Sequence, residues 1–251
     1  SHYNTSLERF DAGWCVDQID SQGIITATKC NYTKNVYAGE FLNDSIFSHA
    51  PAVNHQIRLL VRKEHKDPEA GFYYAFGNTV AEDNTDQLVR VYFNISAAGI
   101  MQLVKSVTEI LNMYSLPFSF KCVNHPFFYT RCDVAVLYLE KRYSNMVFFL
   151  LGEIHEAVRQ YLLADIPLFT KQLAKGIAFA ENPLKIDESF GTHISKMITQ
   201  GIMNAINKNA GKQFWVQEIK MNIEQHHQYA DLETLYLNPN SKYPYAFPKF
   251  N

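Results

Sequence analysis

The sequence predicts an α+β fold, in which an antiparallel or mixed sheet is flanked by long helices and preceded by a β-meander. Two observations lead to this fold class. Short runs rich in β-branched and aromatic residues, separated by turn signals, dominate the first part of the chain, whereas helices enter only later and do not alternate regularly with strands. The composition of the 251 residues, 47% apolar and 19% charged, is that of a globular protein. We expect one domain over 1–251, with a β-rich subdomain over 1–88 as an option.

The N-terminal part reads as strands joined by turns. Gly13–Leu42 has the pattern of a β-meander, in which Asp20–Gly23 forms a turn before the β-branched run Ile24–Thr28. Two further strands are predicted at Ile57–Arg62 and Phe72–Phe76, and Asp67–Gly71 between them has turn chemistry.

The rest of the chain mixes strands and helices. Ser96 is expected to cap a helix that reaches about Tyr114, because apolar residues from Ile100 to Leu111 follow the spacing of one buried face. Ser189 or Thr192 is expected to cap another helix, which ends near Asn207. The remaining expectations are strands at Val89–Ile95, Phe118–Val123, Asp133–Leu139 and Ile177–Ala180, a helix over Arg142–Leu163, a mostly helical stretch Phe214–Leu235, and an ordered coil from Asn238.

Composition and missing motifs exclude several classes of protein. The 23 basic and 25 acidic residues give a net charge of −2, which argues against a nucleic-acid coat or a polybasic membrane patch. No apolar run is long enough to span a membrane, and the first residues do not resemble a signal peptide. Phosphate-loop, dinucleotide-binding, α/β-hydrolase and zinc-protease motifs are absent, so we expect no cofactor and no metal.

The four cysteines show no metal-ligand spacing and are expected to be buried, reduced thiols in a cytoplasmic protein. His155 and the pair His226 and His227 are interpreted as solvated helix residues. The spacing of Glu181 and Asp187 could mimic a glycosidase pair, but it is too common to be specific.

The informative polar residues lie on predicted strands. Alternation places Arg90, Tyr92 and Asn94 on one strand face, and Lys121 interrupts an otherwise apolar strand. Such residues can belong to an ordinary solvated face or to a polar pocket. Further candidates are Tyr129, Arg131 and Asp133 at the start of the next strand, and His193 and Lys196 in the helix entry Ser189–Lys196, which can bind an anion. If these segments converge, Arg90, Lys121, Arg131 and Lys196 would form a phosphate pocket lined with tyrosine.

Four segments within 89–207 resemble the HopA-type family of bacterial type III effectors, and the related lyase or cyclase proteins encoded with class V lanthipeptides. They keep family order and spacing, whereas the first 88 residues and the tail carry no motif of the family. The segments are VRVYFN (89–94), LPFSFKCVNHPFFYTRCDVAVLYL (116–139), PLFTKQLAKGIAFAENP (167–183) and SFGTHISKMITQGI (189–202).

The resemblance implies elimination of phosphate from a phosphorylated peptide, which a kinase-like partner would supply. By this resemblance, Lys121 is the base that removes the Cα proton, Arg131 holds the phosphate, and Arg90 stabilises the phosphate or the enolate-like oxygen. Tyr92 stands where the related lyases have a His acid, and Ile194 follows His193 where the family commonly has Arg. The remaining candidates are Asp133 as a catalytic residue and Asn94, Tyr129, His193 and Lys196 as substrate ligands.

Three functions remain open from the sequence. The first is a phosphopeptide lyase that forms dehydroamino acids. The second is a non-catalytic effector or phosphopeptide-recognition module on the same fold, which the departures at Tyr92 and Ile194 favour. The third is a cyclase that adds a cysteine thiol to a dehydrated peptide. For all three we expect a cytoplasmic protein, or one secreted into a host cell by a type III system, with no nucleic-acid or membrane partner.

Overall fold

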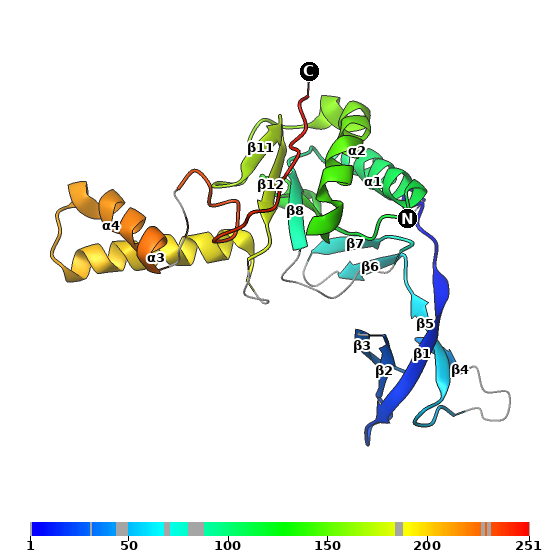
Figure 1. Ribbon diagram of the computed structural model, residues 1–251. Coiled ribbons are helices and arrows are strands. Elements are labelled where there is room, and N and C mark those ends of the chain that lie inside the picture. Colours follow the sequence, from blue (N-terminus) through cyan, green and yellow to red (C-terminus); the bar gives the residue numbers. More distant parts are fainter. Residues whose placement is uncertain are drawn as a thin grey trace.

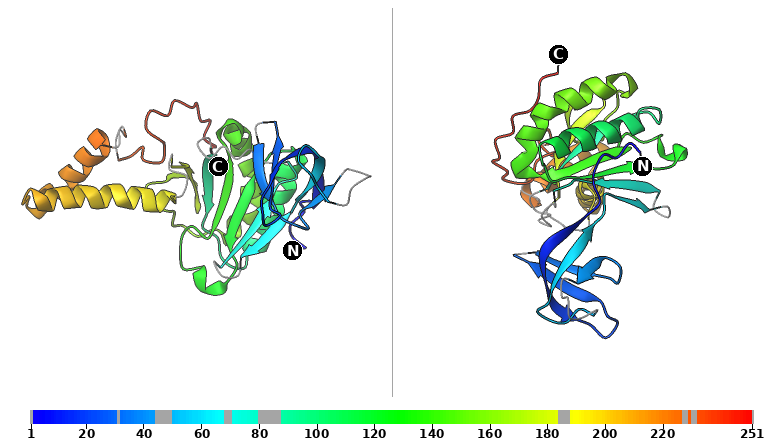
Figure 2. Two further views of the ribbon diagram at one scale, coloured as in Figure 1. Left: turned by 90° about the horizontal axis from the view of Figure 1, so that it is seen from below. Right: turned by 90° about the vertical axis from the view of Figure 1, so that its right-hand side faces the viewer.

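The computed structural model describes residues 2–30, 32–43, 50–67, 71–79, 88–183, 188–226, 229 and 232–250, and it confirms the α+β class. Two antiparallel sheets and four α-helices are the main elements of the described part of the chain (Figure 1). A small five-stranded sheet stands apart from a larger body, and a helical arm projects from another side of that body (Figure 2).

The N-terminal sheet has the strand order β3-β2-β1-β5-β4. The β-meander prediction is confirmed for the first three strands, which pair in sequence, but the fourth strand pairs with the fifth. Trp14, Val16, Ile25 and Ile57 form its small core. The strands are β1 (Arg9–Ile19), β2 (Ile25–Lys29), β3 (Tyr32–Val36), β4 (Phe41–Asn43) and β5 (Gln56–Val61).

The larger sheet has the order β11-β12-β8-β10-β9-β7-β6. Its strands are β6 (Glu64–Asp67), β7 (Phe72–Phe76), β8 (Leu88–Phe93), β9 (Ser119–Val123), β10 (Ala135–Glu140), β11 (Lys171–Ala174) and β12 (Ile177–Glu181). The sequence did not indicate the edge strands β6 and β11, because they are short and polar, as solvent-facing edges often are. Most of the predicted turn at Asp67–Gly71 lies outside the described residues.

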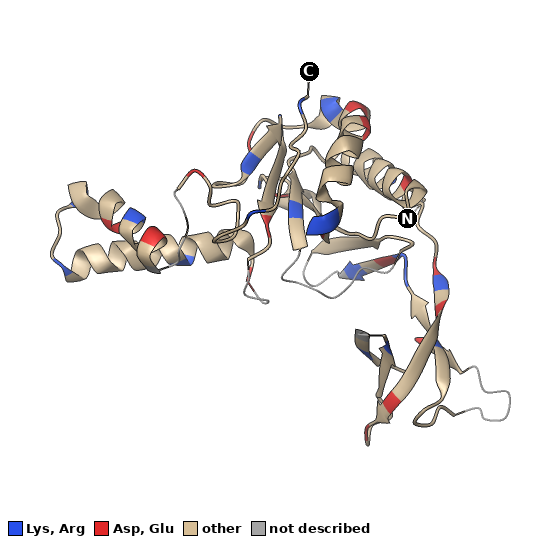
Figure 3. Cartoon of the chain, viewed as in Figure 1, with Lys and Arg blue, Asp and Glu red and all other residues tan. Residues whose placement is uncertain are grey.

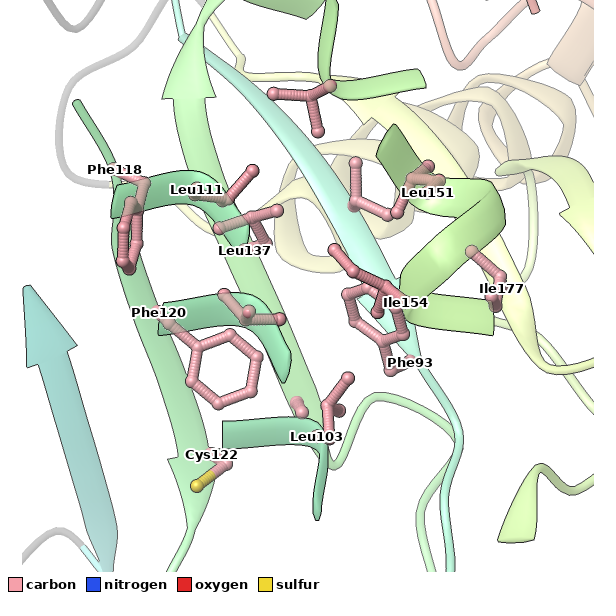
Figure 4. Close-up of a cluster of buried hydrophobic side chains, with 14 of the residues drawn as sticks. Phe93, Leu103, Leu111, Phe118, Phe120, Cys122, Leu137, Leu151, Ile154 and Ile177 are labelled. Atoms are coloured by element: carbon pink, nitrogen blue, oxygen red, sulfur yellow. The ribbon is translucent and has the colours of Figure 1, made fainter. Parts of the chain in front are cut away.

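Helices α1 (Ile100–Met113) and α2 (Ser144–Val158) cover one face of this sheet. Leu103 and Leu111 of α1 and Leu151 and Ile154 of α2 pack on Phe93, Phe120 and Leu137 of the strands (Figure 4). The prediction that Ser96 caps α1 is wrong, because the helix begins after Gly99 and has no side-chain cap. A Cβ on Gly99 would lie 2.3 Å from Cβ of Tyr161, so only glycine fits this approach.

The opposite face is covered in part by the start of α3 (Phe190–Asn207), which then extends into the arm (Figure 1). Ser189 is confirmed as its N-cap, since its side chain accepts a hydrogen bond from the backbone N–H of Thr192. The helical prediction for 214–235 holds for α4 (Trp215–Met221) and a π-helical turn at Asn222–His226, and turns follow from 232. His227 lies outside the described residues.

The C-terminal coil is ordered, as predicted, and it packs on the helix-covered face. Tyr245 and Phe247 contact the rings of Phe148 and Phe179 at centroid distances from 4.8 to 6.2 Å. His155 is not solvated as expected: its side chain is mostly buried and lies 4.8 Å from the ring of Phe250.

The prediction of four buried, reduced cysteines is confirmed only in part. All four cysteines are free, but only Cys122 is buried and Cys30 is exposed. Lys and Arg are interspersed with Asp and Glu over the described elements (Figure 3). Among the described residues, no helix is long and apolar enough to cross a membrane.

Candidate functional site

The face of the large sheet that α3 only partly covers carries a row of polar and apolar side chains. Register pairs Tyr92 of β8 with Val136 of β10, Val136 with Lys121 of β9, and Lys121 with Tyr74 of β7. The next row along the strands contains Arg90, Tyr138 and Ser119. Since neighbouring strands lie about 4.8 Å apart, the backbones at Lys121 and Tyr92 are roughly 10 Å apart, with Val136 between them.

These rows form the floor of a pocket of about 470 Å³. The loop Pro167–Phe169 and the first turn of α3 form part of its wall, together with residues 131–134. Five of the nine predicted site residues line it, namely Arg90, Tyr92, Lys121, Arg131 and Asp133. The other four, Asn94, Tyr129, His193 and Lys196, are absent from its lining.

The Arg90 guanidinium is buried and held at several points. Its Nε donates to Oδ1 of Asn182 at 2.8 Å, and Nη2 donates to the backbone carbonyl of Glu188 at 3.4 Å. Its Cζ also lies 5.4 Å from the centroid of the Tyr138 ring. These contacts fix a positive charge at the floor of the pocket.

The phenol of Tyr92 is buried beside Arg90. Burial raises the pKa of Tyr92 to about 12, and the neighbouring Arg90 guanidinium opposes that rise. The hydroxyl is therefore protonated near neutral pH and able to donate a hydrogen bond or, to a strong base, a proton.

Lys121 projects from the centre of the row. Its Nζ lies 3.6 Å from the centroid of Phe72 and 5.7 Å from that of Tyr74, both on β7. A cation over an aromatic face is stabilised in its charged form. The Lys121 side chain thus lies on the pocket floor, two strands away from Tyr92.

Arg131 and Asp133 form a bidentate ion pair at the mouth of the pocket. Nη2 donates to Oδ2 at 2.7 Å, and Nε donates to Oδ1. The sequence predicts Asp133 as a catalytic group. In the structure, both of its carboxylate oxygens accept hydrogen bonds from Arg131. The Asp133 carboxylate also offsets the charge of the predicted phosphate ligand Arg131.

Asn94 and Tyr129, both predicted as substrate ligands, form hydrogen bonds within the protein. Asn94 donates through Nδ2 to the carbonyl of Asp165 at 2.8 Å, and so ties the segment before Pro167 to the end of β8. Its Oδ1 is the one buried side-chain polar atom without a partner among the described residues. The Tyr129 hydroxyl donates to the carbonyl of Val123 at 3.3 Å.

His193 and Lys196 contact Glu188 and do not line the pocket. Nδ1 of His193 lies 2.8 Å from a Glu188 carboxylate oxygen, and Nε2 lies 3.1 Å from the hydroxyl of Tyr229. Lys196 forms an ion pair with the same carboxylate and is 70% exposed. Lys196 and His193 together lower the pKa of Glu188. Of the four cations considered for a phosphate pocket, Arg90, Lys121 and Arg131 line the pocket, whereas Lys196 does not.

Several pocket residues were not expected from the sequence. Tyr138 shares a face with Val136 by strand alternation, so period-two spacing along β10 could have indicated it. No local pattern reveals Leu168 and Phe169, because only the fold brings them to the pocket, and none reveals that Asn182 holds Arg90 from outside the lining. Cys132 also lines the wall, and burial together with the Asp133 carboxylate raises its pKa.

Metal binding has no support among the described residues. They contain no cluster of three His, Cys, Asp or Glu side chains placed to hold an ion. Glu181, one of the pair considered above, is buried in an ion pair with Lys141 at 2.8 Å. Asp187, the other, lies outside the described residues.

Comparison with protein families places these elements in a known group. The model of the HopA1 effector protein family matches residues 64–237, which include the seven strands of the large sheet and the whole pocket. The chain belongs to the HopA1 effector protein family. Strands β1 to β5 precede the matched region. The comparison with curated proteins gave no match.

Solved structures support the same fold. An effector protein from Pseudomonas syringae pv. tomato strain DC3000 is 15% identical, with a TM-score of 0.55. An effector protein from Pseudomonas syringae pv. syringae strain 61 is 14% identical, with a TM-score of 0.51. In both comparisons the alignment covers 70% of this chain and 66% of the other, so about a third of each Pseudomonas protein has no counterpart here.

Proposed function

We propose that the pocket binds a phosphorylated serine or threonine of a peptide and eliminates its phosphate, leaving a dehydroamino acid. The observation that carries this proposal is the row in which Lys121 and Tyr92 face each other across Val136, with Arg90 beside Tyr92. Together these residues offer a base from β9, and a proton donor and a fixed cation from β8.

In the proposed elimination, each bond change is assisted by one residue of the pocket. Deprotonated Lys121 takes the Cα proton, the Cα–H electron pair forms the Cα=Cβ bond, and the Cβ–O bond breaks to release phosphate. A dianionic phosphate ester would leave as a strongly basic trianion, so transfer of the Tyr92 proton makes the leaving group better. Arg90 stabilises the negative charge that develops on the peptide carbonyl or on the phosphate.

The pocket must supply Lys121 in its neutral form. At rest, the Phe72 ring favours the ammonium, so substrate has to displace this contact and bring the amine beside the Cα–H. We therefore expect elimination to accelerate as pH rises, since alkaline conditions deprotonate the amine. A rate that is constant over the alkaline range would argue against an amine base.

Mass spectrometry of phosphothreonine and phosphoserine peptides tests the proposal. Elimination removes the whole of phosphoric acid and leaves an alkene that captures added thiol, whereas hydrolysis returns the free hydroxyl and would identify a phosphatase. Lys121→Ala should abolish elimination and leave phosphopeptide binding measurable. Lys105→Ala provides the matched control, because Lys105 is exposed on α1, across the sheet from the pocket.

The second candidate is phosphopeptide recognition without chemistry. Two contacts favour it: the stacking of Lys121 on Phe72, and the Asp133 carboxylate that occupies Arg131. Under this candidate, peptides bind in a phosphate-dependent way and are recovered unchanged. The third, a cyclase, predicts thiol addition to a dehydrated peptide without any need for the phosphate.

Membership of an effector family supports a proposal about the place of action. Effectors act inside host cells, so we propose that this chain is delivered there by a type III system and meets its phosphorylated peptide in the host. A kinase-like partner would then be any enzyme that installs the phosphate.

A further inference from the structure

A second pocket, also of about 470 Å³, lies between the N-terminal sheet and the large sheet. The N-terminal sheet contributes Lys34, Asn35 and Val36 of β3 and the end of β5, and the large sheet contributes Ser119 and Tyr138. Strands β1 to β5 precede the region that matches the family, so this pocket combines the shared fold with an additional sheet.

The second pocket continues from the first along the same face of the large sheet. Tyr138 lines both of them. Ser119 in the second pocket lies two residues before Lys121 on β9, a rise of about 7 Å. A peptide that places a phosphorylated residue beside Lys121 can therefore extend into the second pocket along β9 and β10.

The lining favours an extended occupant. Three successive residues of β3 line the pocket, and β3 is the last strand of its sheet among the described strands. The outer side of a terminal strand presents backbone donors and acceptors that an extended segment can use.

The charges of the lining indicate what that segment carries. The three acidic residues of this pocket already have basic partners, since Asp11 pairs with Lys29 at 2.8 Å, Glu40 with Arg62 at 3.4 Å, and Glu140 with Arg142 at 2.8 Å. Lys34 is the one charged lining residue that forms no ion pair within the described residues. An acidic side chain in the occupant would complement it.

We propose that the second pocket binds the stretch of substrate next to the phosphorylated residue, in an extended conformation and with an acidic side chain against Lys34. This inference rests on the proposed function of the first pocket. It assigns the N-terminal sheet to substrate selection and defines the substrate class as phosphopeptides with an acidic flank.

Selection from a library of phosphothreonine peptides with randomised flanks tests the assignment on the full chain. The native protein should enrich Asp or Glu at one flanking position. Lys34→Glu should lose that preference by about fivefold and favour Lys or Arg at the same position, as expected for a partly exposed ion pair. Lys212→Glu, an equal charge reversal on the distant arm, should select the same peptides as the native protein.

The outcomes separate this inference from the proposed function. Phosphate-dependent binding without any acidic preference, or with the same preference in Lys34→Glu, would overturn the role of the second pocket and leave the first intact. If neither protein retains phosphopeptides over their unphosphorylated forms, the proposed function fails and this inference fails with it. Short phosphopeptides that end near the phosphorylated residue should bind native protein and Lys34→Glu equally, and this result also shows that the variant is folded.

Discussion

The two faces of the large sheet use the same strands for different purposes. Phe120 and Lys121 are consecutive on β9: Phe120 is fully buried under α1 and α2, whereas Lys121 lies in the pocket on the opposite side. The helix-covered face is apolar almost throughout, and the pocket face holds two arginines, a lysine and two tyrosines within a few strand spacings. Along one strand, residues that build the core thus alternate with residues that line the pocket.

The largest effect should come from substitutions at this adjacent pair. Phe120→Ala should reduce the free energy of unfolding by about 3–5 kcal/mol, because it leaves a cavity in the core. Lys121→Ala should reduce it by no more than about 1 kcal/mol, the size of a cation–π contact. Urea unfolding of the two variants measures both values, and equal losses would contradict the division of the sheet into a stabilising and a binding face.

The helix-covered face contains one buried carboxylate that is fully compensated. Glu181 forms an ion pair with Lys141 at 2.8 Å and accepts hydrogen bonds from the hydroxyls of Ser241 and Tyr245 and the backbone N–H of Asn238. Three of these partners belong to the C-terminal coil, so this carboxylate holds the coil against the end of β12.

Glu181→Gln should therefore cost roughly 3 kcal/mol at neutral pH, because it leaves the Lys141 ammonium mostly buried without its counterion. The contact with Lys141 and the hydroxyls lowers the pKa of Glu181 below its usual value of 4.5, against the effect of burial. A lowered folded-state pKa stabilises the protein above the unfolded value, and that stabilisation is lost as pH falls through the folded value.

The difference in stability between native protein and Glu181→Gln should thus be constant near neutrality and shrink below about pH 4.5. Thermal unfolding over a pH series measures it. A difference that stays constant down to the lowest pH at which the protein folds would exclude the carboxylate as its source.

The sequence predicts the helix-covered face better than the pocket face. Alternation along β8 predicts Arg90, Tyr92 and Asn94 on one face, because period-two spacing is a local property. Arg90 and Tyr92 line the pocket but Asn94 does not, and alternation alone could not show that Lys121 of β9 lines the same pocket. The distribution of partners is not local. Asp133 binds Arg131, Glu188 binds Lys196, and Asn182 binds Arg90, and only the folded chain shows which cations are already paired. The rim at Leu168 and the edge strands β6 and β11 carry no periodic signal at all.

The pocket face also depends on a helix cap that the other face lacks. The side chain of Ser189 caps α3, whose first turn forms part of the pocket wall, whereas α1 begins without a side-chain cap. Ser189→Ala should reduce the free energy of unfolding by about 1 kcal/mol. It should also increase amide exchange at the first turn of α3. Ser96→Ala is the matched control, since Ser96 precedes α1 without capping it, and equal effects of the two variants would contradict the assignment of the cap.

The smallest effect expected is a gain in binding. Asp133→Asn should increase affinity for a phosphopeptide about threefold, because the Arg131 guanidinium is freed from a partly exposed ion pair and can turn to the phosphate. Titration calorimetry of the two proteins with one phosphopeptide measures it. Combining Asp133→Asn with Arg131→Ala should abolish the gain if it comes from Arg131, whereas a gain that persists would come from the pocket's overall charge. A loss of affinity in the single variant would mean that Asp133 orients Arg131 toward the phosphate, so that the ion pair serves the binding face instead of competing with it.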